Sequence, residues 1–123
     1  MRDYDEAIGW FGRCLGFRLA EDTPLGGTRR WVVMAPAHDG QGASLLLARA
    51  EGERQRAAVG NQAGGRVGFF LYTEDFARKH AAMLAAGVDF REAPRRERYG
   101  TVAVFADLYG NLWDLLEPSG PPA

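Results

Sequence analysis

The chain contains two copies of one pattern, and this repeat restricts its fold more than any other sequence feature. Residues 2–17 ("RDYDEAIGWFGRCLGF") and 74–88 ("EDFARKHAAMLAAGV") both begin with an acid-rich stretch, continue with an aromatic residue and end in glycine plus an apolar residue. Acids are favourable at the start of a helix, where the helix dipole is positive, and glycine is favourable just after its end. Each copy therefore predicts one helix.

In the first copy, Asp3 is the expected N-cap and Gly16 the expected stop. The apolar residues of this helix recur at helical spacing and share one face: Tyr4, Ile8, Phe11 and Leu15. In the second copy, the helix is expected over 75–86, where an apolar face is directed inward. That face comprises Phe76, Met83 and Leu84.

Strand-like segments bounded by turn residues surround the two helices. The expected strands lie at 17–20, 30–35, 43–50, 66–73, 88–94, 101–110 (running into a turn) and 112–117. The expected turns and loops lie at 24–28, 38–42, 51–65 and 95–100. The first half thus reads αβββ and the second βαβββ, so the repeat predicts a missing strand before residue 1.

The composition is that of an ordinary globular domain. The 123 residues are 46% hydrophobic and 25% charged with a net charge of −1, which permits one modest core and offers no electrostatic attraction to nucleic acid. A single cysteine, Cys14, excludes an intrachain disulfide and a cysteine-based zinc site. No apolar run approaches the roughly 20 residues of a membrane span, and the N-terminus lacks the apolar core of a signal peptide. We therefore expect a cytoplasmic protein with no nucleic-acid or membrane partner.

Two motifs together resemble the vicinal oxygen chelate superfamily, which includes glyoxalase I, bleomycin-resistance proteins and extradiol dioxygenases. One is the helix that runs from "DYDEAI" into "LGF", and the other is the closing segment "DLYGNLWDLLEP" at 107–118. The resemblance covers nearly the whole chain. It implies an α+β fold, with tandem βαβββ modules curling mixed sheets into a cup within one domain, 1–123. Module 1 is expected at 1–52, a linker at 53–65 and module 2 at 66–118.

In metal-binding members of that superfamily, four ligands lie on the cup floor, on the first and last strands of each module. Carried onto this sequence, the positions fall on Asp114, Leu46 and Gly68, with the fourth on the missing strand. A divalent metal needs several converging oxygen or nitrogen donors, and one carboxylate does not supply them. We therefore expect no metal at this site, with a divalent ion (Zn, Ni, Mn or Fe) as the alternative cofactor.

Asp114 is the candidate catalytic residue, because it is an acid in the middle of an apolar strand. It is either a ligand remnant, general base or substrate anchor, or else a buried carboxylate that pairs with an arginine or meets water. Strand alternation places Leu112, Asp114 and Leu116 on one face and Trp113 on the other. If Asp114 faces the cup, Trp113 packs beneath a helix.

A ligand pocket is expected on the inner strand faces. Trp31 and Val33 alternate with Val32 and Met34, so one pair lines the cup and the other faces a helix; the pattern leaves the choice open, and we assign the first pair to the pocket. Aromatic residues at such positions also serve as plain core. The expected pocket residues are Trp31, Val33, Leu46, Gly68, Tyr72, Tyr99, Phe105 and Leu112.

The resemblance implies a homodimeric protein that binds a small organic molecule in its cup without a complete metal site. The alternative is a metal-dependent lyase or isomerase of the glyoxalase kind, in which Asp114 is ligand or base. Whether the protein is an enzyme stays open. The missing strand leaves a sheet edge unpaired, and we expect a start codon assigned too late, a partner chain over the edge, or a distorted cup.

Overall fold

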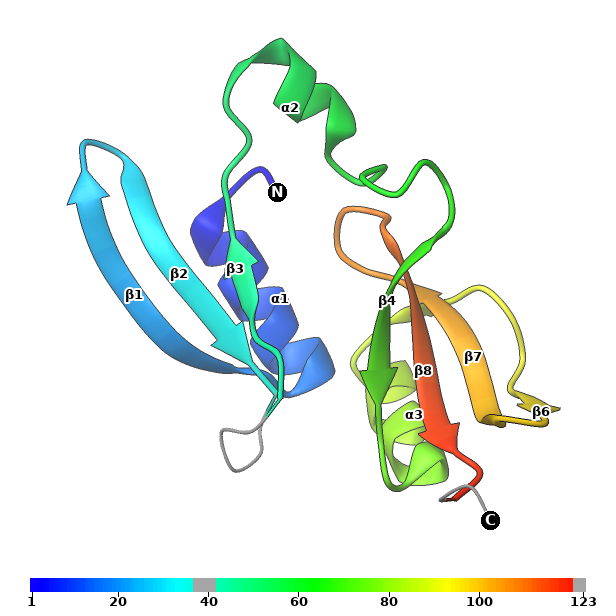
Figure 1. Cartoon of the computed structure of the whole chain (residues 1–123). Helices are drawn as coiled ribbons and strands as arrows, with labels where there is room; N and C mark the ends of the chain where they lie inside the picture. Colours follow the sequence, from blue (N-terminus) through cyan, green and yellow to red (C-terminus); the bar gives the residue numbers. More distant parts are fainter. Residues whose placement is uncertain (37–41, 121–123) are drawn as a thin grey trace. The chain divides into compact units, whose positions relative to one another are not determined.

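The computed structural model describes residues 1–36 and 42–120, and the chain divides into two compact units (Figure 1). Unit 1 is Met1–Val59 and unit 2 begins at Gly60. The turn expected at 38–42 lies outside the described residues except for its last glycine. No helix in the described ranges has the length and apolar character needed to cross a membrane. The curled cup stays a prediction.

The first helix, α1 (Tyr4–Leu15), has both of its predicted caps. The Asp3 side chain accepts a hydrogen bond from the Glu6 amide at 2.8 Å, and Gly16 adopts a left-handed conformation with φ 72°. Ile8 is only half-buried although the pattern predicted it inward, because the buried stripe is centred on the neighbouring turn positions. The buried residues of α1 are Tyr4, Ala7, Trp10, Phe11, Cys14 and Leu15.

Unit 1 adds an antiparallel sheet of three strands in the order β1-β2-β3. The strands are β1 (Arg18–Gly26), β2 (Arg29–Ala35) and β3 (Leu45–Leu47), and α1 contacts β1 and β2. β2 confirms the predicted strand over 30–35. The helix and its sheet form the αβββ order expected from the sequence.

β1 extends over the first three residues of the turn that was predicted at 24–28, and the turn itself is formed by Gly27 and Thr28. Pro24 has no amide hydrogen and would interrupt a central strand, but β1 is an edge strand, where proline is tolerated. The pairing with β2 also shifts register between Pro24 and Gly26. The turn prediction is therefore confirmed at residues 27–28 and wrong at 24–26, because the local sequence does not show that Pro24 lies in an edge strand.

The end of unit 1 differs from the prediction in two ways. β3 is shorter than the strand predicted at 43–50, and α2 (Gly52–Ala58) occupies part of the loop predicted at 51–65. α2 has no buried residue, so no apolar periodicity indicates it in the sequence. Its start is held by the Gln55 side chain, which accepts a hydrogen bond from the Glu51 amide at 2.8 Å.

The first residue of the chain pairs with the segment that follows β3. The Met1 amine donates to the Ala48 carbonyl at 3.1 Å. In unit 2, the Thr73 amide donates to the Leu116 carbonyl at 3.0 Å. Met1 and Thr73 lie at the same position relative to the N-caps of their helices, so these two hydrogen bonds are equivalent in the repeat.

Unit 2 contains a mixed sheet in the order β4-β8-β7-β5. Figure 1 shows β4, β8 and β7 side by side. β4 (Val67–Tyr72) runs parallel to β8 (Leu112–Pro118), which pairs antiparallel with β7 (Gly100–Ala106). The helix α3 (Phe76–Ala85) connects β4 to the later strands and contacts β8. These four elements confirm the strands and the helix predicted for the second half.

The short strands β5 (Asp89–Phe90) and β6 (Arg95–Glu97) both pair with β7. The prediction of a loop over 95–100 is therefore wrong for its first half. In the gap between the two strands, the Glu92 carboxylate accepts a hydrogen bond from the Val104 amide at 2.9 Å and so replaces a strand carbonyl. Counted as one interrupted strand, β5 and β6 complete the predicted βαβββ order.

The helix α3 is capped as expected but buries a narrower face than expected. The Asp75 side chain accepts a hydrogen bond from the Arg78 amide at 3.1 Å. Phe76 and Met83 are buried, as predicted, whereas Leu84 is 51% exposed. Met83 lies at the centre of the buried stripe. Leu84, the next residue, points about 100° away around the helix axis and therefore lies outside the stripe.

The loop at 60–65 closes on the turn that precedes β8. The backbone amide of Gln62 donates a hydrogen bond to Oδ1 of Asn111 at 3.3 Å. In return, Nδ2 of Asn111 donates to Oε1 of Gln62 at 3.2 Å. Gly60 has φ 80°, and a Cβ atom there would overlap the Tyr109 carbonyl. This loop, which belongs to unit 2, is therefore packed against the turn that precedes β8.

The close approach at Gly60 can be tested against a matched glycine. Gly64 also has a left-handed φ, 68°, but a Cβ atom there meets nothing within 4 Å. Gly64→Ala should lower the free energy of unfolding by about 1 kcal/mol through backbone strain alone. Gly60→Ala should cost about 2 kcal/mol more, because the turn must also move. Urea denaturation measures both, and equal costs would contradict the packing described for Gly60.

Candidate functional site

The turn before β8 is organised by one buried carboxylate. Asp107 is 8% exposed, and its Oδ1 accepts hydrogen bonds from the amides of Tyr109, Gly110 and Asn111 at 3.0, 3.1 and 3.0 Å. Its Oδ2 accepts a hydrogen bond from the Trp113 indole at 3.0 Å. Because both oxygens are used, Asp107 has a structural role: it fixes the turn and the first residues of β8.

Trp113 belongs to an aromatic cluster on the α3 side of the sheet. Its ring stacks on Phe69 at 4.6 Å and on Phe105 at 5.8 Å between ring centroids. Phe90 lies 5.6 Å from Phe105 and 4.4 Å from His80 of α3. Phe105 is fully buried in this cluster. The prediction of Phe105 as a pocket residue is therefore corrected: it is core.

Since Trp113 faces α3, the alternation of β8 places Asp114 on the other side of the sheet. Cross-strand pairing sets Phe70 of β4 and Val104 of β7 on either side of it. We call this side of the unit 2 sheet the open face. Its residues in the same alternation include Phe70, Tyr72, Val104, Leu112 and Asp114.

Asp114 is half-buried and incompletely satisfied. Its Oδ1 is buried and has no hydrogen-bond partner among the described residues. Burial raises the pKa of the Asp114 carboxyl above its usual 3.8. The positive charge of nearby Arg95 lowers this pKa, and the negative charge of Glu92 raises it further. The carboxyl is thus held toward its neutral form by its surroundings.

Arg95 does not serve as the direct partner of Asp114, because it is already engaged. Its Nε donates to Glu92 at 3.1 Å, and its Nη1 donates to Glu97 at 2.7 Å and to the Tyr99 hydroxyl at 3.4 Å. Within the part of the chain that the structure describes, Asp114 forms no ion pair. The prediction that Asp114 pairs with an arginine is therefore wrong for the described residues.

The other predicted residues of unit 2 lie on the open face or at its rim. Tyr72 is 58% exposed and Tyr99 is 52% exposed, while Leu112 is half-buried. Gly68 lies where the pairing of β4 with β8 is irregular. Phe70, also 58% exposed, was not predicted, although its alternation with Tyr72 in "VGFFLYT" could have placed it.

The predicted residues of unit 1 share one face of its sheet. Val32 and Met34 are fully buried on the side that α1 contacts, so Trp31 and Val33 lie on the opposite side. Val33 pairs across the strands with Leu46, which is 50% exposed. The choice that the sequence left open between the two pairs is thus settled.

The donor set for a metal is incomplete at the expected positions. Ala48 and Leu116 accept equivalent hydrogen bonds, which makes Leu46 the counterpart of Asp114 in the repeat. Neither Leu46 nor Gly68 offers a donor atom. Across the described ranges, no three His, Cys, Asp or Glu side chains come together in a way that could hold a metal ion. These residues do not fit a divalent ion.

The raised pKa of Asp114 predicts how a neutral replacement behaves with pH. A carboxyl whose pKa is higher in the folded than in the unfolded protein stabilises the fold at pH values below the unfolded-state pKa, near 3.8. This stabilisation is lost as the pH rises through the folded-state pKa. Asp114→Asn should therefore be more stable than the wild type at pH 7, and the gain should vanish below pH 3.8. Chemical denaturation across this pH range tests it; a gain independent of pH would refute the assignment.

The chain matches the family model described as "Glyoxalase/Bleomycin resistance protein/Dioxygenase superfamily" over residues 1–115. It is 52% identical over 118 residues to an uncharacterized protein of Shewanella frigidimarina (strain NCIMB 400). That match covers 95% of this chain and 87% of the relative.

Two solved structures are similar over most of their length. UcmS2 has a TM-score of 0.79 with 28% identity, covering 93% of this chain and 89% of that one. TnmS3, an antibiotic-binding protein from Streptomyces sp. CB03234, has a TM-score of 0.74 with 28% identity, covering 97% and 89%. The family match, the mixed sheet and the tandem repeat lead to one conclusion: this chain belongs to the glyoxalase/bleomycin resistance protein/dioxygenase superfamily.

Proposed function

We propose that the protein binds a small organic molecule on the open face of unit 2, without a complete metal site. The observation that carries the proposal is the Asp114 carboxyl, whose buried Oδ1 has no partner among the described residues. A buried acceptor without a donor costs free energy, so a ligand that brings a donor recovers that cost on binding. A purely apolar ligand would not recover this cost, because it offers no hydrogen-bond donor.

The surroundings of Asp114 indicate what the rest of the ligand should be. Phe70, beside it in the sheet, and Tyr72 are both exposed, and their rings meet edge to face with centroids 6.3 Å apart. Such rings favour a flat aromatic partner. We infer a planar ligand that carries a hydroxyl or amino group directed at Asp114. The likeness to TnmS3, an antibiotic-binding protein, supports a ligand of this general kind.

The role of the donor can be isolated with a matched pair of probes. 2-Naphthol carries a hydroxyl, and 2-methoxynaphthalene has the same ring system without the donor. A hydrogen bond to a charged or buried carboxyl is worth about 1.5 kcal/mol, so 2-naphthol should bind the wild type about 10-fold more tightly. NMR titration of the labelled protein measures both dissociation constants.

Two variants serve as controls for that comparison. Asp114→Ala should abolish the preference for 2-naphthol while leaving 2-methoxynaphthalene almost unchanged. Phe70→Leu should weaken both probes by a similar factor, since it removes only the ring surface. If the wild type binds the two probes equally well, or binds neither, the proposed function is wrong.

The alternative function, a metal-dependent lyase or isomerase, requires donors that the described residues do not bring together. Protein stripped by a chelator can be titrated with zinc, nickel, manganese and iron(II), beside Asp114→Ala. A metal at 100 times its dissociation constant would stabilise the fold by about 2.7 kcal/mol. We expect no rise in melting temperature that depends on Asp114. A rise in the wild type that the variant lacks would favour the lyase.

We also propose that the protein is a homodimer, as its superfamily resemblance implies. Every residue of β1 is exposed, and this strand forms an edge of the unit 1 sheet. A long exposed edge is commonly protected by another chain. Light scattering after gel filtration measures the mass in solution, and a monomer at micromolar concentration would rule the dimer out.

A further inference from the structure

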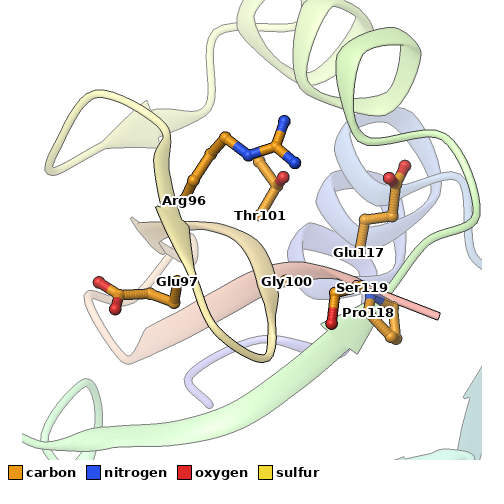
Figure 2. Close-up of a pocket in the computed structure, with 7 residues that line it drawn as sticks. All are labelled: Arg96, Glu97, Gly100, Thr101, Glu117, Pro118 and Ser119. Carbon is orange, nitrogen blue, oxygen red and sulfur yellow. The ribbon is translucent and has the colours of Figure 1, made fainter. Parts of the chain in front are cut away.

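A second polar site lies on the α3 side of unit 2, across the sheet from Asp114. Here a hollow of about 180 Å³ opens where β7 begins and β8 ends. Its polar lining comprises Arg96, Glu97, Thr101, Glu117 and Ser119 (Figure 2), and Glu97 is neutralised by its ion pair with Arg95. A single water molecule needs only about 10–15 Å³ of such a cavity, so the hollow has room for more than one water molecule. The hollow can therefore take a small, compact ligand.

Three of these residues form one row across three strands. Arg96 of β6 pairs with Thr101 of β7, and Thr101 pairs with Glu117 of β8. Figure 2 shows the three side chains rising on the same side of the sheet. Neighbouring strands lie about 4.8 Å apart, so the backbones of Arg96 and Glu117 are separated by about 10 Å, with the Thr101 hydroxyl between them.

The two charges of this row do not neutralise each other. Arg96 forms no ion pair or hydrogen bond within the described residues, in contrast to Arg95 next to it. Glu117 accepts a hydrogen bond from the Phe76 amide through Oε1 at 2.8 Å, and its carboxylate has no cationic partner in the described ranges. A free cation and a carboxylate thus face one hollow, with a hydroxyl between them.

We propose that the hollow binds a small zwitterion of the α-amino acid class. The guanidinium of Arg96 takes the ligand carboxylate, for which its planar fork is suited. Glu117 takes the ammonium group through the oxygen that does not hold the Phe76 amide. A simple anion would be repelled by Glu117 and a simple cation by Arg96, so only a ligand with both charges satisfies the row.

The geometry of the row restricts the size of the ligand. The shape of the turn is fixed locally, because Gly100 has φ 152° and a Cβ atom there would overlap the Glu117 carbonyl. Ser119 is tied back to Arg98, whose carbonyl accepts a hydrogen bond from the Ser119 hydroxyl at 3.0 Å. The hollow is therefore preformed, and its mostly polar lining favours a short polar side chain such as that of serine.

Three probes separate the two charges of the ligand. L-serine carries both, lactate carries only the carboxylate, and ethanolamine carries only the ammonium group. Titrations followed by the backbone amide signals of Thr101 and Ser119 should give a dissociation constant of about 1 mM for L-serine. Lactate and ethanolamine should each bind at least about 10-fold more weakly, which is the loss of one charge-assisted contact.

Variants then assign the two ends of the ligand. Arg96→Gln should weaken L-serine about 10-fold and should not weaken ethanolamine, because the variant loses the charge that repels the ammonium group. Glu117→Gln should weaken L-serine similarly and should not weaken lactate, because the charge that repels the lactate carboxylate is gone. Glutamine keeps an acceptor for the Phe76 amide, so α3 retains its first contact. Arg98→Gln, a neighbouring arginine outside the lining, is the matched control and should have no effect.

The outcomes are distinct. Binding of L-serine that depends on both Arg96 and Glu117 establishes the site. No signal change with L-serine, or lactate binding as tightly as L-serine, overturns it, as does an equal effect of Arg98→Gln. Asp114→Ala should leave L-serine binding intact, so the result here is independent of the result at the open face.

Discussion

The four hydrogen bonds of Asp107 are the contact on which the rest of unit 2 depends. Three amides and an indole converge on one buried carboxylate, a set that repays the cost of burying the charge. Because the carboxylate spans the turn between β7 and β8, it fixes their register. A shift of one residue would carry every side chain of β8 to the opposite face. Asp114 would then point at α3 and Trp113 at solvent.

The same carboxylate joins the turn to the core. The Trp113 indole is both its fourth donor and the centre of the aromatic cluster beneath α3. The turn cannot loosen without disturbing the packing of Phe69 and Phe105. The loop at 60–65 adds a second constraint through the reciprocal amide contact of Gln62 with Asn111. The segment "DLYGN" thus has a structural role, and the proposed binding residue Asp114 lies in the strand that it positions.

Much of this could be predicted from the sequence, and the failures have physical causes. The caps at Asp3 and Gly16 are local, so they were found. The strand β6 and the helix α2 were missed, because neither buries an apolar face of its own. Phe105 was wrongly assigned to the pocket because the local sequence does not show which face of the sheet its side chain occupies. That face follows from the pairing of Phe105 with Trp113, which only the register of the β7–β8 hairpin reveals. For the same reason, the free Oδ1 of Asp114 and the engagement of Arg95 were beyond the sequence.

The repeat also explains why both proposed sites lie in unit 2. Leu46 occupies the place of Asp114, and β3 is a strand of three residues where β8 has seven. The longer strand carries a carboxyl on each face: Asp114 on the open face and Glu117 on the α3 side, separated by the buried Leu115 and Leu116. Buried apolar residues separate the two acids along the strand, and the alternation of side chains places the acids on opposite faces of the sheet. One strand, held in register by Asp107, therefore carries an anchoring carboxyl for each of the two proposed sites.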